Sequence, residues 1–384
     1  MSTLDAIAPF QEELTEIRRD IHAHPELGLE VPRTAGLVAQ HLRSWGVEVA
    51  TNIGGHGVVG TIVGKDGEGP IVGLRADMDA LPINEAVDVP WRSQVAGRMH
   101  ACGHDGHTTM LLGAARYLAD TRNFKGTARL IFQPGEEGAG GALAMLNDGL
   151  FARFHCDAIY ALHNCPGLQL GNFSVTSGPF MAGGAFFDVH VVGKGSHGAT
   201  PEAGADPVVA AAQIVTALQS VVSRSLSPFE PAVLSITRIH GGEAYNVIPD
   251  TVIIGGTVRW LLPDTLPKIE RLMRRTVDQV ASGLGTSAHV EWRILFNPVI
   301  NRDDHANIAA DCAAAVVGEE KVLRNAPPLM ISEDFSFLLE QVPGAYVQLG
   351  IGDAADLHNP EYAFNDDAIP YGSAFFAKLV ERAA

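Results

Sequence analysis

Apolar side chains near the start of the chain recur every three or four residues, which is the period of an amphipathic helix. The residues with this spacing are Leu4, Ile7, Leu14, Ile17 and Ile21. The pattern predicts a helix over residues 5–24 that ends at Pro25, because proline cannot continue a helix. A second helix is predicted over residues 32–45, closed by Gly46.

Short apolar runs follow, and they alternate with further helical patterns. The strand-like runs are "GVVGTIVG" (57–64), "IVGLRAD" (71–77), "ARLIFQP" (128–134) and "DAIYALH" (157–163). Helices are predicted at 107–120 and 141–149. This alternation is typical of an α/β domain, so we expect a large, mostly parallel sheet flanked by helices.

The pattern changes near "GGAFFDVHVVGKG" (183–195), where a second domain begins. The predicted order there is strand 185–193, helix 206–224, strands 232–240 and 250–261, helix 265–283 and strand 287–295. This βαββαβ order is that of a ferredoxin-like α+β domain. The chain then continues with helix 304–318, a strand near 345–350 and a last helix near 370–382. We therefore expect a discontinuous first domain, 1–183 and 297–384, with residues 184–296 inserted into it.

Composition narrows the classes of function. The 384 residues are 46% hydrophobic and 18% charged, as in a well-packed globular protein, and the net charge is −17. Nucleic acid and anionic membranes need a positive surface, so neither is an expected partner. The N-terminus has no apolar signal segment, no window approaches the ~18 apolar residues of a membrane span, and four scattered cysteines argue against disulfides. We expect a cytoplasmic protein.

Candidate metal ligands fall where the predicted strands end or the helices begin, and such positions converge at one edge of a parallel sheet. They are Asp77, Asp79, Cys102, His104, Glu136, Glu137, His163 and His358. Thiolate, imidazole and carboxylate together suit two divalent ions such as Zn, Mn, Ni or Co. Thiolate can bridge two cations, and one of the adjacent Glu136 and Glu137 can bind metal while the other accepts a proton.

Each candidate also has a simpler interpretation. A single histidine or cysteine is usually a packed side chain, a Glu-Glu pair is usually a solvated surface pair, and aspartate favours turns. Co-location on glycine- and proline-rich loops at strand ends favours the metal site over these alternatives. His107 is placed outside the site, at the start of a helix, and His22 and His24 are expected to pack at the first helix end. His100 receives no role.

Nine stretches resemble the amidohydrolase branch of the M20 metallopeptidase family, which contains hippurate hydrolases, auxin-conjugate hydrolases and N-acetyl-diaminopimelate deacetylases. They are "RRDIHAHPELGLE" (18–30), "LRADMDALPI" (74–83), "MHACGHDGHTTMLLGAA" (99–115), "FQPGEEG" (132–138), "ALHNCP" (161–166), "GKGSHGATPEAGADPV" (193–208), "GGEAYNVIPD" (241–250), "SEDFSF" (332–337) and "LHNPEYAFND" (357–366). They cover essentially the whole chain, and together they are specific.

The resemblance implies roles for individual residues. The implied metal ligands are Cys102, His104, Glu137, His163 and His358. Glu136 is the implied general base, and Asp77 resembles the aspartate behind the metal site, although Asp79 can hold that place instead.

The resemblance also implies that the inserted domain makes a homodimer or homotetramer and closes over substrate. His197 resembles the histidine that stabilises the oxyanion, often across the dimer. Asn246 and Arg259 resemble groups that bind the substrate carboxylate or the tetrahedral intermediate. One departure is Ile331, which stands where similar proteins have a small residue, and this bears on the shape of the substrate pocket.

The expected activity is hydrolysis of the amide bond of small N-acyl-amino acids by metal-activated water. Three other readings stay open: a di- or aminopeptidase, a carboxypeptidase of the same metal chemistry, and a catalytically silent metal-dependent binding protein. The first needs a group that recognises a free α-amine, and no spare acidic residue stands out for it. The last would be favoured if Glu136 or a ligand were missing, and none is.

Overall fold

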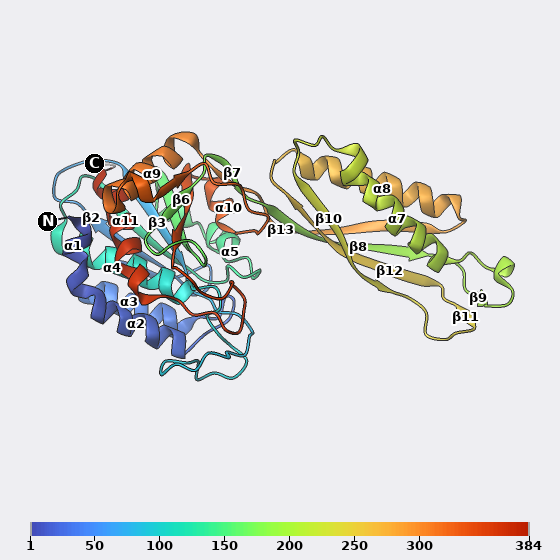
Figure 1. The fold of residues 1–384 in the computed structure, drawn as a ribbon, viewed down its shortest axis with the longest axis horizontal. Coiled ribbons are helices and arrows are strands. Elements are labelled where there is room, and N and C mark those ends of the chain that lie inside the picture. Colours follow the sequence, from blue (N-terminus) through green and yellow to red (C-terminus); the bar gives the residue numbers. More distant parts are fainter. Residues whose placement is uncertain (1, 383–384) are drawn as a thin grey trace. The chain divides into compact units, whose positions relative to one another are not determined.

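The structure is a computed structural model that describes residues 2–382. The chain forms two compact units. The first unit contains the residues up to Phe180, Ile300–Pro327 and the residues from Asp334 on, and the second contains Met181–Val299 and Pro328–Glu333. Figure 1 labels their helices and strands.

An eight-stranded sheet forms the centre of the first unit, with the order β1-β2-β4-β3-β5-β16-β6-β15. Its strands are β1 (Glu48–Ile53), β2 (Gly57–Val63), β3 (Ile71–Asp77), β4 (Thr127–Gln133), β5 (Ala158–Cys165), β6 (Phe173–Val175), β15 (Val322–Arg324) and β16 (Gly344–Gly350). The predicted mostly parallel sheet is in fact mixed. Strands β4, β3, β5 and β16 are parallel, whereas β1–β2, β2–β4 and β6–β16 are antiparallel. A tight turn joins β1 to β2, and such a turn permits only antiparallel pairing.

Helices surround this sheet. They are α1 (Thr3–Ile7), α2 (Gln11–Ala23), α3 (Pro32–Ser44), α4 (His104–Thr121), α5 (Gly141–Asn147), α6 (Leu150–Arg153), α9 (Asp303–Val317), α10 (Phe335–Leu339) and α11 (Ile369–Arg382), with 3₁₀ turns at Ala8–Phe10, Glu319–Lys321 and Asp366–Ala368. The helix expected over 5–24 is interrupted by the 3₁₀ turn that contains Pro9, because proline lacks the N–H that an α-helix needs. Helix α4 begins three residues before the expected position 107, which places His104 in its first turn.

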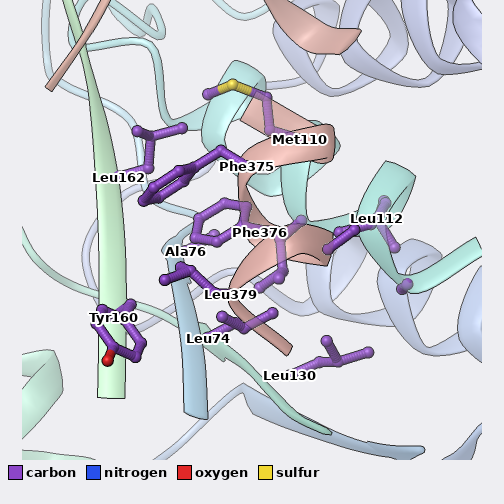
Figure 2. Packing of buried hydrophobic residues seen from close by; sticks show 14 of the residues in the cluster. Leu74, Ala76, Met110, Leu112, Leu130, Tyr160, Leu162, Phe375, Phe376 and Leu379 are labelled. Carbon is purple, nitrogen blue, oxygen red and sulfur yellow. The ribbon is translucent and has the colours of Figure 1, made fainter. Parts of the chain in front are cut away.

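The main core lies between the sheet and helices α4 and α11. Figure 2 shows the aromatic rings of Phe375 and Phe376 among apolar side chains from α4 and from strands β3, β4 and β5. Both phenylalanines are fully buried, as are Leu74 and Met110. Burial of this apolar surface stabilises the layer that carries the carboxyl ends of the parallel strands.

Strand β16 occupies an interior position that comes from late in the chain. It runs parallel to β5, where Gln348 is opposite His163, and antiparallel to β6 on its other side. The sheet is therefore continuous only when residues 344–350 lie between two strands that come from residues 158–175.

The second unit contains a four-stranded antiparallel sheet with the order β10-β12-β8-β13. Its elements are β8 (Gly183–Val192), α7 (Pro207–Ser225), β10 (Ala232–His240), β12 (Thr251–Trp260), α8 (Thr265–Gly283) and β13 (Ser287–Phe296). Strands β9 (Ser196–His197) and β11 (Val247–Ile248) pair as one short ribbon, and a 3₁₀ turn spans Pro201–Ala203. Strands β7 (Gly178–Met181) and β14 (Val299–Asn301), most of whose residues belong to the first unit, pair as another ribbon. The two helices and one face of the four-stranded sheet enclose a separate apolar core.

Helix α7 is the one helix in residues 2–382 that is long and apolar enough to cross a membrane by length and composition, with a mean hydropathy of 1.2. Its buried residues are Pro207, Ala210, Ala211, Ile214, Leu218 and Val221. This spacing of three and four residues places them on one side of the helix, against the second core.

Phe375→Ala should lower the free energy of unfolding by about 3–5 kcal/mol, because it leaves a cavity in a core that is closed on all sides. Urea denaturation of the variant and the wild type measures the difference. Phe229→Ala removes a ring that is 88% exposed and should change the same quantity by less than about 0.5 kcal/mol. Equal effects of the two substitutions would contradict this view of the core.

Candidate metal centre

The structure brings the predicted donors of the first unit together at one edge of its sheet. Asp77 is the last residue of β3, Glu136 and Glu137 follow β4, and His163 lies near the end of β5. Cys102 precedes α4, His104 begins it, and His358 lies in the loop after β16. The carboxyl ends of parallel strands meet at one edge, which is why these distant segments converge.

Cys102 belongs to two different groups of possible ligands. In one group its donor atom lies within 4.8 Å of those of His104 and His163, and in the other within 4.8 Å of those of Glu137 and His358. The Cys102 Sγ lies 3.4 Å from His163 Nε2, and Glu137 Oε1 lies 3.2 Å from His358 Nε2. One thiolate is thus shared by two sets of donors, which is the arrangement that two cations with a bridging ligand require.

His163 is held in the tautomer that a metal ligand needs. Its Nδ1 lies 2.7 Å from the carbonyl oxygen of Asn164, which can only accept a hydrogen bond. Nδ1 therefore carries the proton, and the lone pair of Nε2 points at Cys102.

The loop that carries Glu136 and Glu137 is held by Asp79. The carboxylate of Asp79 accepts hydrogen bonds from the backbone N–H of Glu136 at 2.9 Å and of Glu137 at 3.2 Å. Gly135 before them has φ +69°, and a Cβ there would lie 2.7 Å from the Leu29 side chain, so glycine fits this turn best. Glu136 is buried, and its donor atom lies within 4.8 Å of those of His104 and Glu137.

Both aspartates considered from the sequence flank His104. Asp77 Oδ2 lies 3.8 Å from His104 Nε2, and Asp79 Oδ1 lies 3.6 Å from His104 Nδ1. Asp77 is also bound by other groups, since its carboxylate accepts from Arg75 at 2.7 Å and lies 2.6 Å from His107 Nδ1. Asp79 thus contacts both the glutamate loop and the imidazole, whereas Asp77 mainly neutralises cationic and imidazole neighbours.

His107, which sequence reasoning placed outside the site, is buried beside it. Its Nδ1 donates to Asp77, and its Nε2 accepts the backbone N–H of Asn164 at 3.0 Å. Both ring nitrogens are occupied, so His107 supports its neighbours. Spacing offered a signal, because His107 lies three residues after His104 on the same helix. Asn164 also donates to the carbonyl oxygen of Cys102 at 2.6 Å.

A buried ion-pair network at the two ends of the glutamate loop, residues 134–141, was also not predicted from the sequence. Asp334, from the "SEDFSF" stretch, accepts from Arg75 at 3.0 Å, from Gln133 at 2.8 Å and from the backbone N–H of Ala142 at 2.9 Å. Gln133 and Ala142 are the residues on either side of the loop 134–141. One carboxylate therefore fixes both ends of the segment that carries Glu136.

Burial and charge oppose each other in the pKa values of the donors. Burial, together with Glu137 and Glu136, raises the pKa of the Cys102 thiol well above its usual range. Burial lowers the pKa of His104, but Asp77 and Asp79 outweigh it and raise the value to about 10. Burial lowers the pKa of His163 well below its usual value. A divalent cation would favour the thiolate and the neutral imidazoles, because it interacts favourably with lone pairs and negative charge.

Several of the candidate metal ligands also have buried polar atoms that make no hydrogen bond. Both ring nitrogens of His104 are buried and have no hydrogen-bond partner among the described residues, and neither has Oε1 of Glu137, although His358 Nε2 lies 3.2 Å from it. Unpaired buried polar atoms are costly. Coordination of a metal ion would satisfy the carboxylate oxygen and one of the two ring nitrogens.

A second buried cluster lies beside the metal centre. His22, expected only to pack at the end of its helix, has Nδ1 2.8 Å from Asp105 and Nε2 3.1 Å from Glu85. Arg18 also donates to Asp105, at 3.1 Å. Burial lowers the pKa of His22, but the two carboxylates outweigh it and raise the pKa to about 9.

The three other predicted site residues, His197, Asn246 and Arg259, belong to the second unit. His197 lies on β9, where its Nδ1 accepts from the N–H of Ala199 at 3.1 Å, and the carbonyl oxygen of Asn246 accepts from Gly198 at 2.8 Å. Arg259 on β12 is half-buried, and no carboxylate within residues 2–382 pairs with it. Burial lowers its pKa. Ile331, the departure noted in the sequence, is 50% exposed.

A mixed α/β fold that gathers thiol, imidazole and carboxylate beside a buried glutamate has the parts of a metal-dependent hydrolase. The family model described as Peptidase family M20/M25/M40 matches residues 73–382, and the chain belongs to this family.

Close relatives agree with this membership. The chain is 41% identical to a hippurate hydrolase of Campylobacter jejuni over 99% of its own length and 98% of that protein. It is 40% identical to an IAA-amino acid hydrolase ILR1-like 2 of Arabidopsis thaliana, over 95% and 84%. The crystal structure of the Bacillus subtilis YXEP protein, described as a dinuclear metal binding peptidase from the M20 family, matches with a TM-score of 0.87, 34% identity and 98% coverage of both chains.

The raised pKa of His22 predicts a loss of stability in alkaline solution. The protonated form is favoured by folding, so its contribution is full below the unfolded pKa of 6.5 and is lost as pH rises through about 9. The shift corresponds to at most about 3 kcal/mol. Urea unfolding of the wild type and of His22→Gln between pH 6 and pH 10 should show a difference that shrinks with rising pH. His155→Gln, at an exposed histidine, serves as the control, and a constant difference for His22→Gln would contradict the charged state.

Proposed function

We propose that this protein hydrolyses the amide bond of small N-acyl-amino acids and releases a carboxylic acid and a free amino acid. The observation that carries the proposal is the position of Cys102 in two groups of donors with buried Glu136 beside them. The names of the relatives, a hippurate hydrolase and an IAA-amino acid hydrolase, support an acylated amino acid as the substrate class.

The ligands of the proposed metal centre are the donors that converge at the sheet edge. They are Cys102, His104, Glu137, His163 and His358. The dinuclear description of the 34%-identical structure supports two divalent ions, for which Zn, Mn, Ni and Co all suit this donor set. When bound, such ions supply Lewis-acid chemistry, since they polarise a carbonyl group and lower the pKa of water.

Glu136 is the proposed general base. It accepts a proton from the water that attacks the acyl carbon, and it returns that proton to the nitrogen of the leaving amino acid. Asp79 positions it, because the same carboxylate binds the backbone of Glu136 and lies beside His104. The sequence favoured Asp77 for this positioning role. In the proposed site, its carboxylate instead pairs with Arg75 and binds His107.

The proposed substrate-binding groups come from the second unit. Because His197 Nδ1 accepts a hydrogen bond, Nε2 of the neutral ring carries the proton and can donate to the oxyanion of the tetrahedral intermediate. Arg259 pairs with no carboxylate in the described chain, so its charge is available for the carboxylate of a substrate. Asn246 accepts a hydrogen bond from the backbone N–H of Gly198, the residue after His197. Its side-chain amide is the proposed second polar group for the substrate beside His197.

We propose that residues 184–296, the main part of the second unit, form an inserted ferredoxin-like domain that supports dimerisation and closure over substrate. Its strand β10 is an edge of the sheet with Val233 and Ile239 exposed. Such edges favour pairing with another chain, which supports a homodimer or homotetramer.

A panel of acylated amino acids tests the activity. The enzyme, loaded in turn with Zn²⁺, Mn²⁺, Ni²⁺ or Co²⁺, is incubated with acetyl-, benzoyl-, indole-acetyl- and long-acyl-amino acids, with free dipeptides as controls. We expect release of free amine from acylated substrates only. Release from dipeptides alone would identify a peptidase instead, and no release from any compound would favour a binding protein.

Glu136→Gln is the matched negative control for that panel. It should lower kcat by at least about 10²–10⁴-fold, the contribution of acid–base catalysis, while elemental analysis still finds the metal content of the wild type. Near wild-type turnover in this variant would remove Glu136 from the role of base.

Cys102→Ser should weaken retention of both ions, because Cys102 belongs to both donor groups. Elemental analysis after dialysis against a weak chelator measures the metal content per chain. Cys312→Ser, at a buried cysteine outside the site, is the control and should keep the wild-type content. Unchanged metal content in the Cys102 variant would refute its role as a shared ligand.

A further inference from the structure

Two histidines and one glutamate meet on the second unit's sheet, on the face away from its helices. Alternate residues of β8, such as Val189 and Val191, are buried in the second core, so His190 between them faces the other way. His190 is directly opposite His289 of β13. Glu291 is two residues beyond His289 and therefore lies on the same face.

The three side chains are arranged around one point. The imidazole rings of His190 and His289 are stacked, with centroids 4.9 Å apart and an interplanar angle of 8°. The Glu291 carboxylate lies 3.4 Å from His190 Nε2 through one oxygen and 3.6 Å from His289 Nε2 through the other. One donor atom from each residue lies within 4.8 Å of the other two.

A simple ion pair does not account for this arrangement. The Nε2 atom of His190 is shielded from solvent and has no hydrogen-bond partner among the described residues, although the carboxylate is near. A nitrogen shielded from water without a hydrogen bond is costly, and a metal ion between the three side chains would give it a partner.

The arginines near Glu291 bind another carboxylate, that of Asp188. Asp188, directly opposite Glu291, is bound by Arg238 at 2.5 Å and by Arg293 at 2.9 Å. Two of the arginines on this face, Arg238 and Arg293, thus contact Asp188 rather than Glu291. Within the described chain, the partners of Glu291 are the two imidazoles.

We propose that His190, His289 and Glu291 form a second metal site, separate from the catalytic centre, that binds one divalent transition-metal ion. Two imidazoles and one carboxylate suit Zn²⁺, Ni²⁺ or Cu²⁺, and three protein ligands leave further positions for water. The site spans β8 and β13, so an ion there links the two strands. It shares no residue with the donors around Cys102 and does not depend on the proposed hydrolase activity.

Zinc counting on the full-length protein tests the site. Wild type, His289→Ala and Glu291→Gln are equilibrated by dialysis with micromolar free Zn²⁺, and zinc per chain is measured by elemental analysis. Each variant should hold one ion fewer than the wild type. The control is His240→Ala, which removes an exposed imidazole from the same face; His240 is separated from His190 by Ile253 and should not affect the count.

Two further measurements separate this site from the catalytic one. His289→Ala should keep wild-type hydrolysis of acylated amino acids, whereas Cys102→Ser should lose the other ions and keep the one that His289 binds. A zinc-soaked crystal of the wild type should show an anomalous peak between His190, His289 and Glu291. Equal zinc content in wild type and His289→Ala, or no peak there, would overturn the proposal.

Discussion

The first unit is organised around the need to bury several carboxylates in one place. Asp77, Asp79, Glu136 and Asp334 are each at most 6% exposed and lie at the same edge of the sheet. Buried charges are stable only when they are paired and hydrogen-bonded. Arg75 neutralises Asp77 and Asp334, backbone N–H groups bind Asp79, and the donor atom of Glu136 lies within 4.8 Å of that of His104. The residual negative charge makes this edge a natural site for cations.

Much of this arrangement could be predicted from the sequence, because strand ends are visible in the apolar pattern and the candidate ligands follow them. Helix α3, strands β3 and β4 and the donors around Cys102 were found in this way. The sheet was harder to predict, since a short strand such as β6, with three residues, has no detectable period. Support residues were missed for a different reason. Arg75 and Asp334 act through a hydrogen bond between distant segments, and neither spacing nor composition encodes such a pair. For His107, which binds Asp77, the three-residue spacing from His104 was the one available signal.

These support residues show how stretches without a candidate ligand or base can still position the residues of the site. Asp334 holds both ends of the glutamate loop, so the "SEDFSF" stretch positions Glu136 without touching a reacting atom. Asn164 similarly links the segments of Cys102, His107 and Tyr362 through its amide. Such contacts keep the functional groups within the narrow geometry that acid–base chemistry needs.

The interior position of β16 has a consequence for synthesis on the ribosome. When residues 158–175 leave the exit tunnel, β5 and β6 exist but the strand that separates them is still almost 170 residues away. The emerging half-sheet has an unpaired, apolar edge until then, and such edges attract other nascent chains. The second unit, in contrast, is encoded almost entirely in one stretch and can fold while the remainder is translated. Chaperone dependence should therefore be concentrated in the first unit, in the interval before the residues of β16 appear.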